Sequence, residues 1–296
     1  MTLQRESGTA KRAQSPVPTT ASALSQATEG LAAISGSPRL DAEILLAHIT
    51  GKNRSHFRAW PEKELAPEEA AEFWRLVGQR REGVPIAYLI GLREFWSREF
   101  EVSPEVLIPR PETELLVEQA LTIIPPDRAA RILDLGVGSG AIAITLALER
   151  PLAEVSALDL SPAALAVAQR NAARHRAGDV RFLHSDWFGA LPHDKCFDVI
   201  VSNPPYIAET DPHLSRGDVR FEPALALSSG ADGLNDIRRI VRQAPAHLVS
   251  GGWLLIEHGY DQAEAVRGLL QQTGFEAVAS HADLQGHRRV SGGRLS

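Results

Sequence analysis

The sequence predicts an α/β protein whose larger domain is a mostly parallel β-sheet covered by helices on both faces. From about Leu115 onward, short apolar runs alternate with stretches of helical character such as residues 162–174. That rhythm is typical of repeated strand–helix units. The runs are apolar at nearly every position, as expected for strands buried on both faces. The predicted strands cover residues 131–135, 154–158, 180–183, 197–201 and 253–256.

Length and composition also predict how the chain divides into domains. The chain has 296 residues, of which 44% are hydrophobic, so it can bury one large core and a second, modest one. We expect the α/β domain to cover residues 115–296. Before it we expect a tail over residues 1–30, a small helical domain over 31–92 and a hairpin linker over 93–114.

Helix-start and helix-stop signals mark the small domain. Ser37 and Pro38 precede an amphipathic run that Gly51 ends. A second predicted helix begins at Pro67 and carries basic residues in its last turn, up to Arg81. In the linker the aromatic and β-branched content rises, and we expect the hairpin turn at Ser103-Pro104.

The first 30 residues are rich in Ser, Thr, Ala and Gln. Such a segment has little apolar surface to offset the entropy lost on ordering, so we expect it to be mostly disordered. Its basic, hydroxyl-rich character also fits an organellar transit peptide, which stays open beside a plain bacterial extension.

Charge and cysteine content exclude several classes of protein. The 31 basic and 37 acidic residues give a net charge of −6, which argues against holding nucleic acid through wide electrostatic contact. Cys196 is the only cysteine, so neither an internal disulfide nor a multi-cysteine metal site can form. We expect no metal site. With no apolar stretch long enough to span a membrane and no secretion signal, we expect a cytoplasmic protein.

A glycine-rich loop follows the first predicted strand. Gly136, Gly138 and Gly140 alternate with Val137 and Ser139 before an apolar helical run. Glycines let the backbone turn sharply and approach a ligand, and the helix N-terminus attracts an anionic group. Asp159 ends the next strand, about 20 residues on, where a carboxylate can bind ribose hydroxyls. We predict a nucleoside cofactor. NAD stays possible, because the loop also fits the dinucleotide pattern.

A second motif, Asn203-Pro204-Pro205-Tyr206, follows the strand predicted over residues 197–201. Two prolines stiffen the segment and remove two N–H donors. The side-chain oxygen of Asn203 and the carbonyl of Pro204 can each accept one hydrogen of a planar NH₂ group, while the ring of Tyr206 stacks on it. The motif therefore predicts a site that presents an amino or amide nitrogen to an electrophile.

These motifs resemble those of the class I S-adenosylmethionine-dependent methyltransferases that methylate amide or exocyclic amino nitrogens. A narrower resemblance, to the peptide chain release factor glutamine methyltransferases (the PrmC/HemK family), runs from about residue 37 to residue 289. The segments that carry it, in the same order and at similar spacing, are 85–91, 93–96, 107–114, 185–188, 218–223 and 257–259.

The resemblance implies a Rossmann-like fold with a mostly parallel seven-stranded sheet and a small N-terminal helical domain that holds the protein substrate. It implies transfer of a methyl group from S-adenosyl-L-methionine, giving S-adenosyl-L-homocysteine. The acceptor would be the side-chain nitrogen, N5, of the glutamine in the Gly-Gly-Gln motif of class 1 release factors, which act in translation termination.

The resemblance also assigns the site. Asp159 would bind the ribose, and Trp187 would lie against the adenine. Asn203, Pro204 and Tyr206 would act in catalysis and, with Pro205, bind the substrate amide. The implied cofactor-binding residues are Gly136, Val137, Gly138, Ser139, Gly140, Asp159, Asp186, Trp187 and Asn203.

Some charged residues near the predicted pocket have two possible roles. Arg110, Glu112 and Glu114 form either a wall of the substrate cleft or an interdomain salt-bridge cluster. Glu257 acts in catalysis or only holds a loop, and we expect His258 to support the site from behind.

Three other functions stay open. Adenine presents the same planar amino group, so an adenine-N6 DNA or RNA methyltransferase is the nearest alternative. An NAD(P) oxidoreductase would explain the glycine loop but leave the motif at Asn203 without a role. A non-enzymatic adaptor would need neither.

Overall fold

The computed structural model describes residues 17–192 and 196–296. Between Leu89 and Ile90 the chain divides into two compact units. The unit boundary lies close to the expected end of the helical domain at residue 92. None of the helices in the described part of the chain combines the length and apolar character that a membrane-spanning helix needs.

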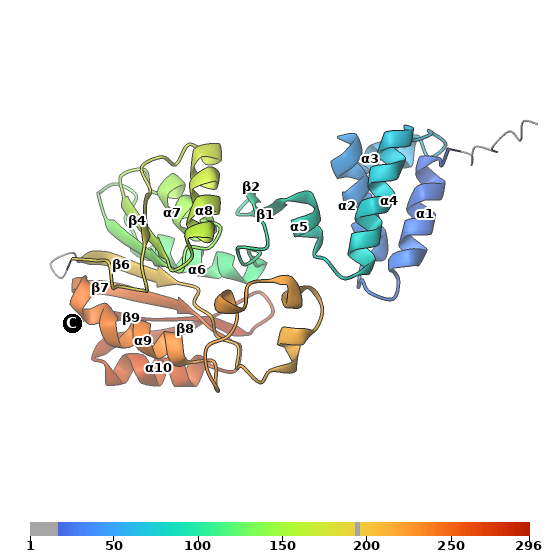
Figure 1. Cartoon of the computed structure of the whole chain (residues 1–296). Coiled ribbons are helices and arrows are strands. Elements are labelled where there is room, and N and C mark those ends of the chain that lie inside the picture. Colours follow the sequence, from blue (N-terminus) through green and yellow to red (C-terminus); the bar gives the residue numbers. More distant parts are fainter. Residues whose placement is uncertain (1–16, 193–195) are drawn as a thin grey trace, which may run out of the picture. The chain divides into compact units, whose positions relative to one another are not determined.

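The first unit is a small helical bundle (Figure 1). Its apolar side chains, among them Leu24, Leu45 and Phe73, are fully buried where three of the helices pack together. The helices are α1 (Thr20–Leu31), α2 (Pro38–Thr50), α3 (Arg54–Ala59) and α4 (Pro67–Arg81), and α5 (Ile86–Ile90) crosses the division.

The expectation of disorder is wrong for the part of the tail that forms α1. Thr19 caps this helix by accepting the N–H of Ser22 at 3.2 Å, and Ala23, Leu24 and Ala27 pack into the bundle. Small apolar residues at helical spacing form a buried stripe that the polar composition of the segment conceals. Residues 1–16 of the predicted tail lie outside the described residues.

A β-hairpin opens the second unit, but its turn is not where the sequence predicts it. Strands β1 (Leu92–Phe95) and β2 (Arg98–Glu101) pair antiparallel through Trp96 and Ser97, which have φ of 53° and 56°. Glu114 supports this uncommon backbone by accepting the N–H of Trp96 at 2.7 Å. Ser103 and Val106 close a separate turn with a bond of 3.1 Å.

The rest of the second unit is built on a seven-stranded sheet with the order β5-β4-β3-β6-β7-β9-β8. β3 to β7 pair in parallel, and β9 runs antiparallel to both of its neighbours. This confirms the predicted fold class. The strands are β3 (Arg131–Leu135), β4 (Glu154–Asp159), β5 (Arg181–His184), β6 (Phe197–Ser202), β7 (Leu248–Glu257), β8 (Phe275–Ala282) and β9 (Arg288–Leu295).

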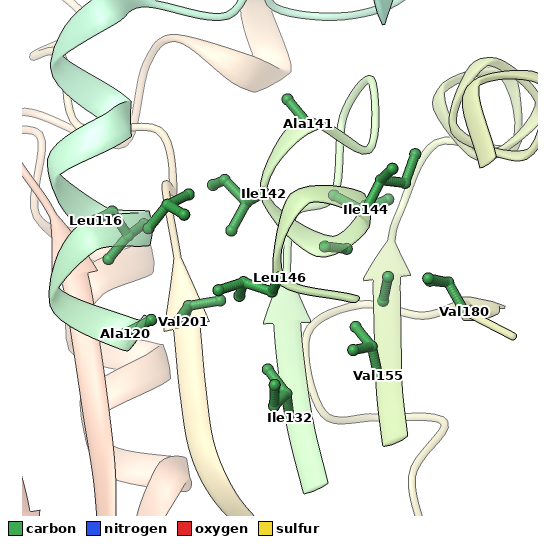
Figure 2. Close-up of a cluster of buried hydrophobic side chains, with 14 of the residues drawn as sticks. Leu116, Ala120, Ile132, Ala141, Ile142, Ile144, Leu146, Val155, Val180 and Val201 are labelled. Atoms are coloured by element: carbon green, nitrogen blue, oxygen red, sulfur yellow. The ribbon is translucent and has the colours of Figure 1, made fainter. Parts of the chain in front are cut away.

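Helices cover both faces of the sheet, and each face has its own buried core (Figure 1). Figure 2 shows part of the first core, in which Leu116 and Leu146 approach Ile132, Val155 and Val201 of the strands. On this face lie α6 (Glu114–Ile123), α7 (Ala141–Glu149) and α8 (Pro162–His175), and on the other α9 (Asn235–Gln243) and α10 (Ala263–Gln272). Short 3₁₀ helices cover Pro111–Thr113, Pro212–Ser215, Asp218–Phe221, Ala224–Ala226 and Ala244–His247.

The strand order fixes where a ligand can bind. β3 has β4 on one side and β6 on the other, and Leu135 pairs with both Leu158 and Ser202. The chain thus passes from β3 to β4 and β5 on one side and then crosses to β6 on the other side of β3. In open α/β sheets this switch point, at the carboxyl ends of the strands, forms the binding crevice.

We predict that the first unit depends on an ion pair between α2 and α4. Arg80 Nε donates to Asp41 Oδ2 at 2.8 Å, and the two side chains are only 7% and 9% exposed. Arg80→Ala leaves a buried carboxylate without its cation, which costs about 3–5 kcal/mol. Native-state hydrogen exchange of α2 and α4 amides measures this loss of stability.

The control for Arg80 is Arg75→Ala on the same helix. Arg75 pairs with Glu72, but the two side chains are 54% and 47% exposed, so the change should cost far less stability than Arg80→Ala. Equal losses in the two variants would contradict the prediction.

A second prediction concerns Asp134, which is fully buried in β3. Its Oδ2 accepts the N–H of Ala143 at 3.1 Å, and burial raises its pKa to about 7. Between pH 4 and 7 the folded state keeps a proton that the unfolded state has lost. This group therefore lowers stability as the pH rises through that range, by about 1.4 kcal/mol per unit.

Asp134→Asn keeps an acceptor for Ala143 and cannot ionise. Relative to the natural protein, the variant should gain stability from pH 4 to 7 and no more above that range. Denaturant unfolding at pH 5, 6, 7 and 8 tests this, because other titrating groups contribute equally to both proteins. A difference in stability independent of pH would refute it.

Candidate active site

A cavity of about 360 Å³ lies at the carboxyl ends of β3, β4 and β6, within the second unit. The strands deliver one motif each to its wall: the glycine loop after β3, Asp159 at the end of β4 and Asn203 after β6. Residues from 105–113, from 185–187 after β5, from 223–228 and from α9 complete the wall. The lining includes Glu105–Leu107, Pro109, Thr113, Gly136–Ser139, Leu158–Ser161, Ser185–Trp187, Asn203, Pro205, Pro223, Leu225, Ala226, Ser228, Asp236 and Arg239.

The glycine loop is held in shape by its own N–H groups. Gly136 and Val137 both donate to the carbonyl of Leu158 at 2.9 Å, and Gly138 donates to Asp159 Oδ2 at 2.9 Å. Gly136 and Gly138 have φ of 78° and 53°, a backbone region that side chains disfavour. The N–H donors of these three residues therefore bind the protein itself rather than an anion.

Gly140 differs from the other predicted cofactor residues. It does not belong to the cavity lining, and a Cβ there would lie 2.7 Å from Ile144 Cδ1 and 3.2 Å from Ala168 Cβ. This glycine allows α7 and α8 to pack closely, so its role in the structure is packing.

Asp159 lies where a ribose-binding carboxylate is predicted, in the cavity wall. Besides Gly138, its carboxylate accepts the N–H of Ser161 at 2.8 Å. Burial raises the pKa of Asp159, and these hydrogen bonds oppose the shift. Each oxygen keeps lone-pair capacity for a further donor, such as a hydroxyl.

Trp187 forms a flat wall beside the glycine loop. A Cβ on Gly136 would lie 3.5 Å from Cζ3 of the indole, so the ring lies directly against the backbone of the loop at Gly136. Trp187 has a φ of 48°, and its indole N–H donates to Asp236 Oδ1 at 3.1 Å. Strained backbone held by a specific partner is common at binding sites.

The sequence analysis does not predict two residues of this wall, Asp236 and Arg239. Asp236 binds both Trp187 and the hydroxyl of Ser229, the latter at 2.7 Å, and Arg239 pairs with Asp186 at 2.9 Å. Both lie on α9, and the tertiary packing of this helix brings them to the cavity. No local motif marks them in the sequence.

Asn203 places a buried polar atom without a hydrogen-bond partner, among the described residues, in the cavity wall. Its Nδ2 donates to Thr113 Oγ1 at 3.2 Å, while Oδ1 is buried and has no hydrogen-bond partner among the residues that the structure describes. A buried acceptor without a donor costs about 1–3 kcal/mol. Asn203 lines the cavity, so a ligand that carries an N–H group can remove this cost.

The remaining residues of this motif are divided between the cavity wall and the region behind it. Pro205 lines the cavity, whereas Pro204 and Tyr206 are outside the lining. The Tyr206 hydroxyl donates to Glu257 Oε1 at 3.3 Å. Burial raises the pKa of both groups, that of Glu257 to about 7. Glu257 thus holds the motif from behind.

Glu222 joins two walls of the cavity. Its fully buried carboxylate pairs with Arg110 and accepts the N–H of Ile108 at 3.2 Å. Glu114 instead supports the hairpin turn described above. The contacts of Arg110 and Glu114 both lie within the second unit, so neither is an interdomain salt bridge.

His258 is buried outside the cavity lining, where its Nε2 meets Ser291 Oγ at 2.7 Å, and burial lowers its pKa. In the described part of the chain, no three His, Cys, Asp or Glu side chains are grouped to hold a metal ion.

The fold is similar to that of known methyltransferases. A crystal structure of a methyltransferase from Pyrococcus furiosus matches 68% of this chain and 90% of its own, with a TM-score of 0.51 and 16% identity. The catalytic domain of hMettl16, solved with the MAT2A 3′UTR hairpin 6, matches 78% of this chain and 82% of its own, with a TM-score of 0.54 and 16% identity. At this identity the similarity shows the fold alone.

Sequence comparison is more specific. Residues 22–91 match the family model of the PrmC N-terminal domain, and residues 111–220 match that of the methyltransferase small domain. The release factor glutamine methyltransferase of Salmonella typhimurium is 51% identical over 88% of this chain and 94% of its own length. The same-named protein of Pseudomonas aeruginosa is 53% identical over the same shares, and that of Vibrio cholerae is 49% identical over 92% and 95%. The chain belongs to the family of release factor glutamine methyltransferases.

Proposed function

We propose that this protein transfers a methyl group from S-adenosyl-L-methionine to the side-chain amide nitrogen of the glutamine in the Gly-Gly-Gln motif of class 1 release factors. The observation that carries the proposal is the buried, unpartnered Oδ1 of Asn203 in the cavity wall. An amide NH₂ supplies the donor that this atom lacks. Relatives at about 50% identity that bear this activity in their names support the same substrate.

The cavity suits S-adenosylmethionine, which when bound supplies a methyl group on a positively charged sulfur. In this proposal Asp159 binds the ribose hydroxyls, and Trp187, with Asp186 nearby, holds the adenine. Residues 136–139 surround the methionine part. Gly140 contributes through the packing of α7 rather than by contact.

The acceptor site orients a poor nucleophile. The lone pair of an amide nitrogen is delocalised into its carbonyl, so reaction depends on alignment, which is worth up to about 7–11 kcal/mol. Asn203 Oδ1, in the cavity wall, accepts one amide hydrogen. In this proposal the carbonyl of Pro204 accepts the other and Tyr206 contacts the planar group, both from positions next to the lining rather than in it. Both oxygens also stabilise the positive charge that develops on nitrogen. The spare proton leaves to water, and no dedicated base is required.

The first unit, by this proposal, holds the release factor, because a glutamine presented by a large protein needs contacts beyond the pocket. The match of residues 22–91 to the PrmC N-terminal domain supports this assignment. A substrate that acts in translation termination also supports a cytoplasmic location.

We predict that Asn203→Ala reduces methyl transfer at least 100-fold, because the acceptor oxygen is lost. Its affinity for S-adenosylmethionine should stay within tenfold of the natural protein, or about 1.4 kcal/mol. Label transfer to a release factor measures turnover, and equilibrium dialysis measures cofactor affinity. A release factor with its glutamine changed to Ala is the substrate control.

Two outcomes would contradict this proposal. Unchanged turnover in Asn203→Ala would remove the acceptor role. Label on a DNA or RNA control with none on the release factor would instead favour adenine methylation.

We also predict that Asp159→Ala weakens S-adenosylmethionine binding by about tenfold to a hundredfold. The change removes charged hydrogen bonds to the ribose, worth about 1.5–3 kcal/mol each, and releases Gly138 from its loop position. Equilibrium dialysis with labelled S-adenosylmethionine and, separately, NAD gives the affinities.

Asp179→Ala, at an exposed position after α8, is the matched control for Asp159 and should bind normally. Equal affinities for S-adenosylmethionine in the Asp159 variant and the control would exclude the ribose contact. Preferential binding of NAD by the natural protein would exclude the cofactor.

A further inference from the structure

Gln262, at the start of α10, joins three loops behind the acceptor motif. Its Nε2 donates to the carbonyl of Tyr206 at 2.9 Å and to that of Asp232 at 3.2 Å. Its Oε1 accepts the N–H of Gly259 at 2.8 Å. The side-chain amide therefore uses both its donor and its acceptor on main-chain groups.

The carbonyl of Tyr206 is closely confined on another side as well. Gly233 packs against it so tightly that a Cβ would lie 2.2 Å from the carbonyl oxygen. The N–H of Tyr206 donates to Leu227 at 3.2 Å, and its hydroxyl donates to Glu257. The N–H, the carbonyl and the hydroxyl of Tyr206 thus all have hydrogen-bond partners, and Gln262 binds the carbonyl.

The proximal end of the motif is equally well held. Ser202, which precedes it, donates its hydroxyl to the carbonyl of Leu135 at 2.8 Å, and Thr113 accepts from Asn203. Because the φ angles of Pro204 and Pro205 are fixed, few backbone torsions between Tyr206 and Asn203 can absorb a shift at Tyr206. The orientation of Asn203 then depends on how Tyr206 is held.

We propose that Gln262 is a positioning residue for methyl transfer, which fixes the main chain of Tyr206 and through it the acceptor oxygens of Asn203 and Pro204. The inference rests on the proposed role of Asn203 as the acceptor residue. A displacement of about 1 Å in a reacting geometry costs about 100-fold in rate, so the contribution of Gln262 is measurable.

The first test is Gln262→Ala in the full-length protein. Turnover (kcat) should fall about 10-fold to 100-fold, while KM for the release factor and the affinity for S-adenosylmethionine change less than about threefold. Gln271→Ala, at an exposed position of the same helix, is the control and should behave like the natural protein.

The second test, Gln262→Glu, separates positioning from packing. A neutral glutamic acid has the shape of glutamine, donates its O–H to the Tyr206 carbonyl and accepts from Gly259. Its carboxylate has no hydrogen to donate and directs negative charge at two carbonyl oxygens. Relative to the natural protein, kcat of this variant should therefore rise as the pH falls, following the protonation of one group.

The natural protein, measured over the same pH range, accounts for the other ionisable groups near this position. These are Tyr206, Asp232 with its partner Arg238, Glu257, His258, Asp261 and Arg289. Thermal unfolding of both proteins at each pH shows whether a change in kcat reflects a change in folding. A purely structural role would lower stability without producing a pH-dependent recovery of kcat.

The outcomes distinguish the inference from the function on which it rests. Natural kcat in Gln262→Ala, or a loss in Gln262→Glu that is the same at every pH, overturns the positioning role. If Asn203→Ala is inactive in the same assays, the proposed function still stands. If Asn203→Ala is fully active, the acceptor role fails, and the inference fails with it.

Discussion

The parallel register of β3 between β4 and β6 is the constraint on which the site depends. It brings the ends of three strands to one edge, and each end carries a group that lines the cavity: the glycine loop, Asp159 and Asn203. Residues far apart in the sequence become neighbours through main-chain hydrogen bonds alone. Apolar cores on both faces of the sheet, one of them drawn in Figure 2, then hold this register against displacement.

The loops at this edge are preorganised by contacts with one another. Gly138 binds Asp159, Trp187 binds Asp236, and Asn203 binds Thr113. Each contact joins segments from different parts of the chain, so the cavity walls are set before a ligand arrives. Binding energy is then available for orientation rather than for ordering loops. This matters for an amide acceptor, because its weak nucleophilicity leaves alignment as the main source of rate.

The sequence predicts the central strands well because their apolar runs end at glycine or polar motifs that also carry the chemistry. It does not reveal β8 and β9, for two physical reasons. In β8 most side chains are exposed or half-buried, so no apolar run marks it, and β9 contains Gly292 where the backbone of Leu254 comes too close for any Cβ. Only the family resemblance predicts seven strands. Asp236 and Arg239 could not be found either, since tertiary packing of α9 alone brings them to the cavity. In α1 the buried stripe of small residues is hidden by a polar composition.

Among the buried polar atoms without a partner in the described residues, three lie at the carboxyl ends of neighbouring strands: Oδ1 of Asp134, Oδ1 of Asn203 and Oε2 of Glu257. The two acids have a way to reduce the cost of burial, because each can bind a proton, and burial raises the pKa of both to about 7. An amide oxygen has no such option at any ordinary pH. Asn203 is also the only one of these three that lines the cavity. A donor from a bound ligand, such as the N–H group of the amide in the proposed function, can supply the missing hydrogen bond of Asn203. In the proposed function the three residues therefore have different roles: Asp134 and Glu257 shape the site from behind, and Asn203 meets the substrate.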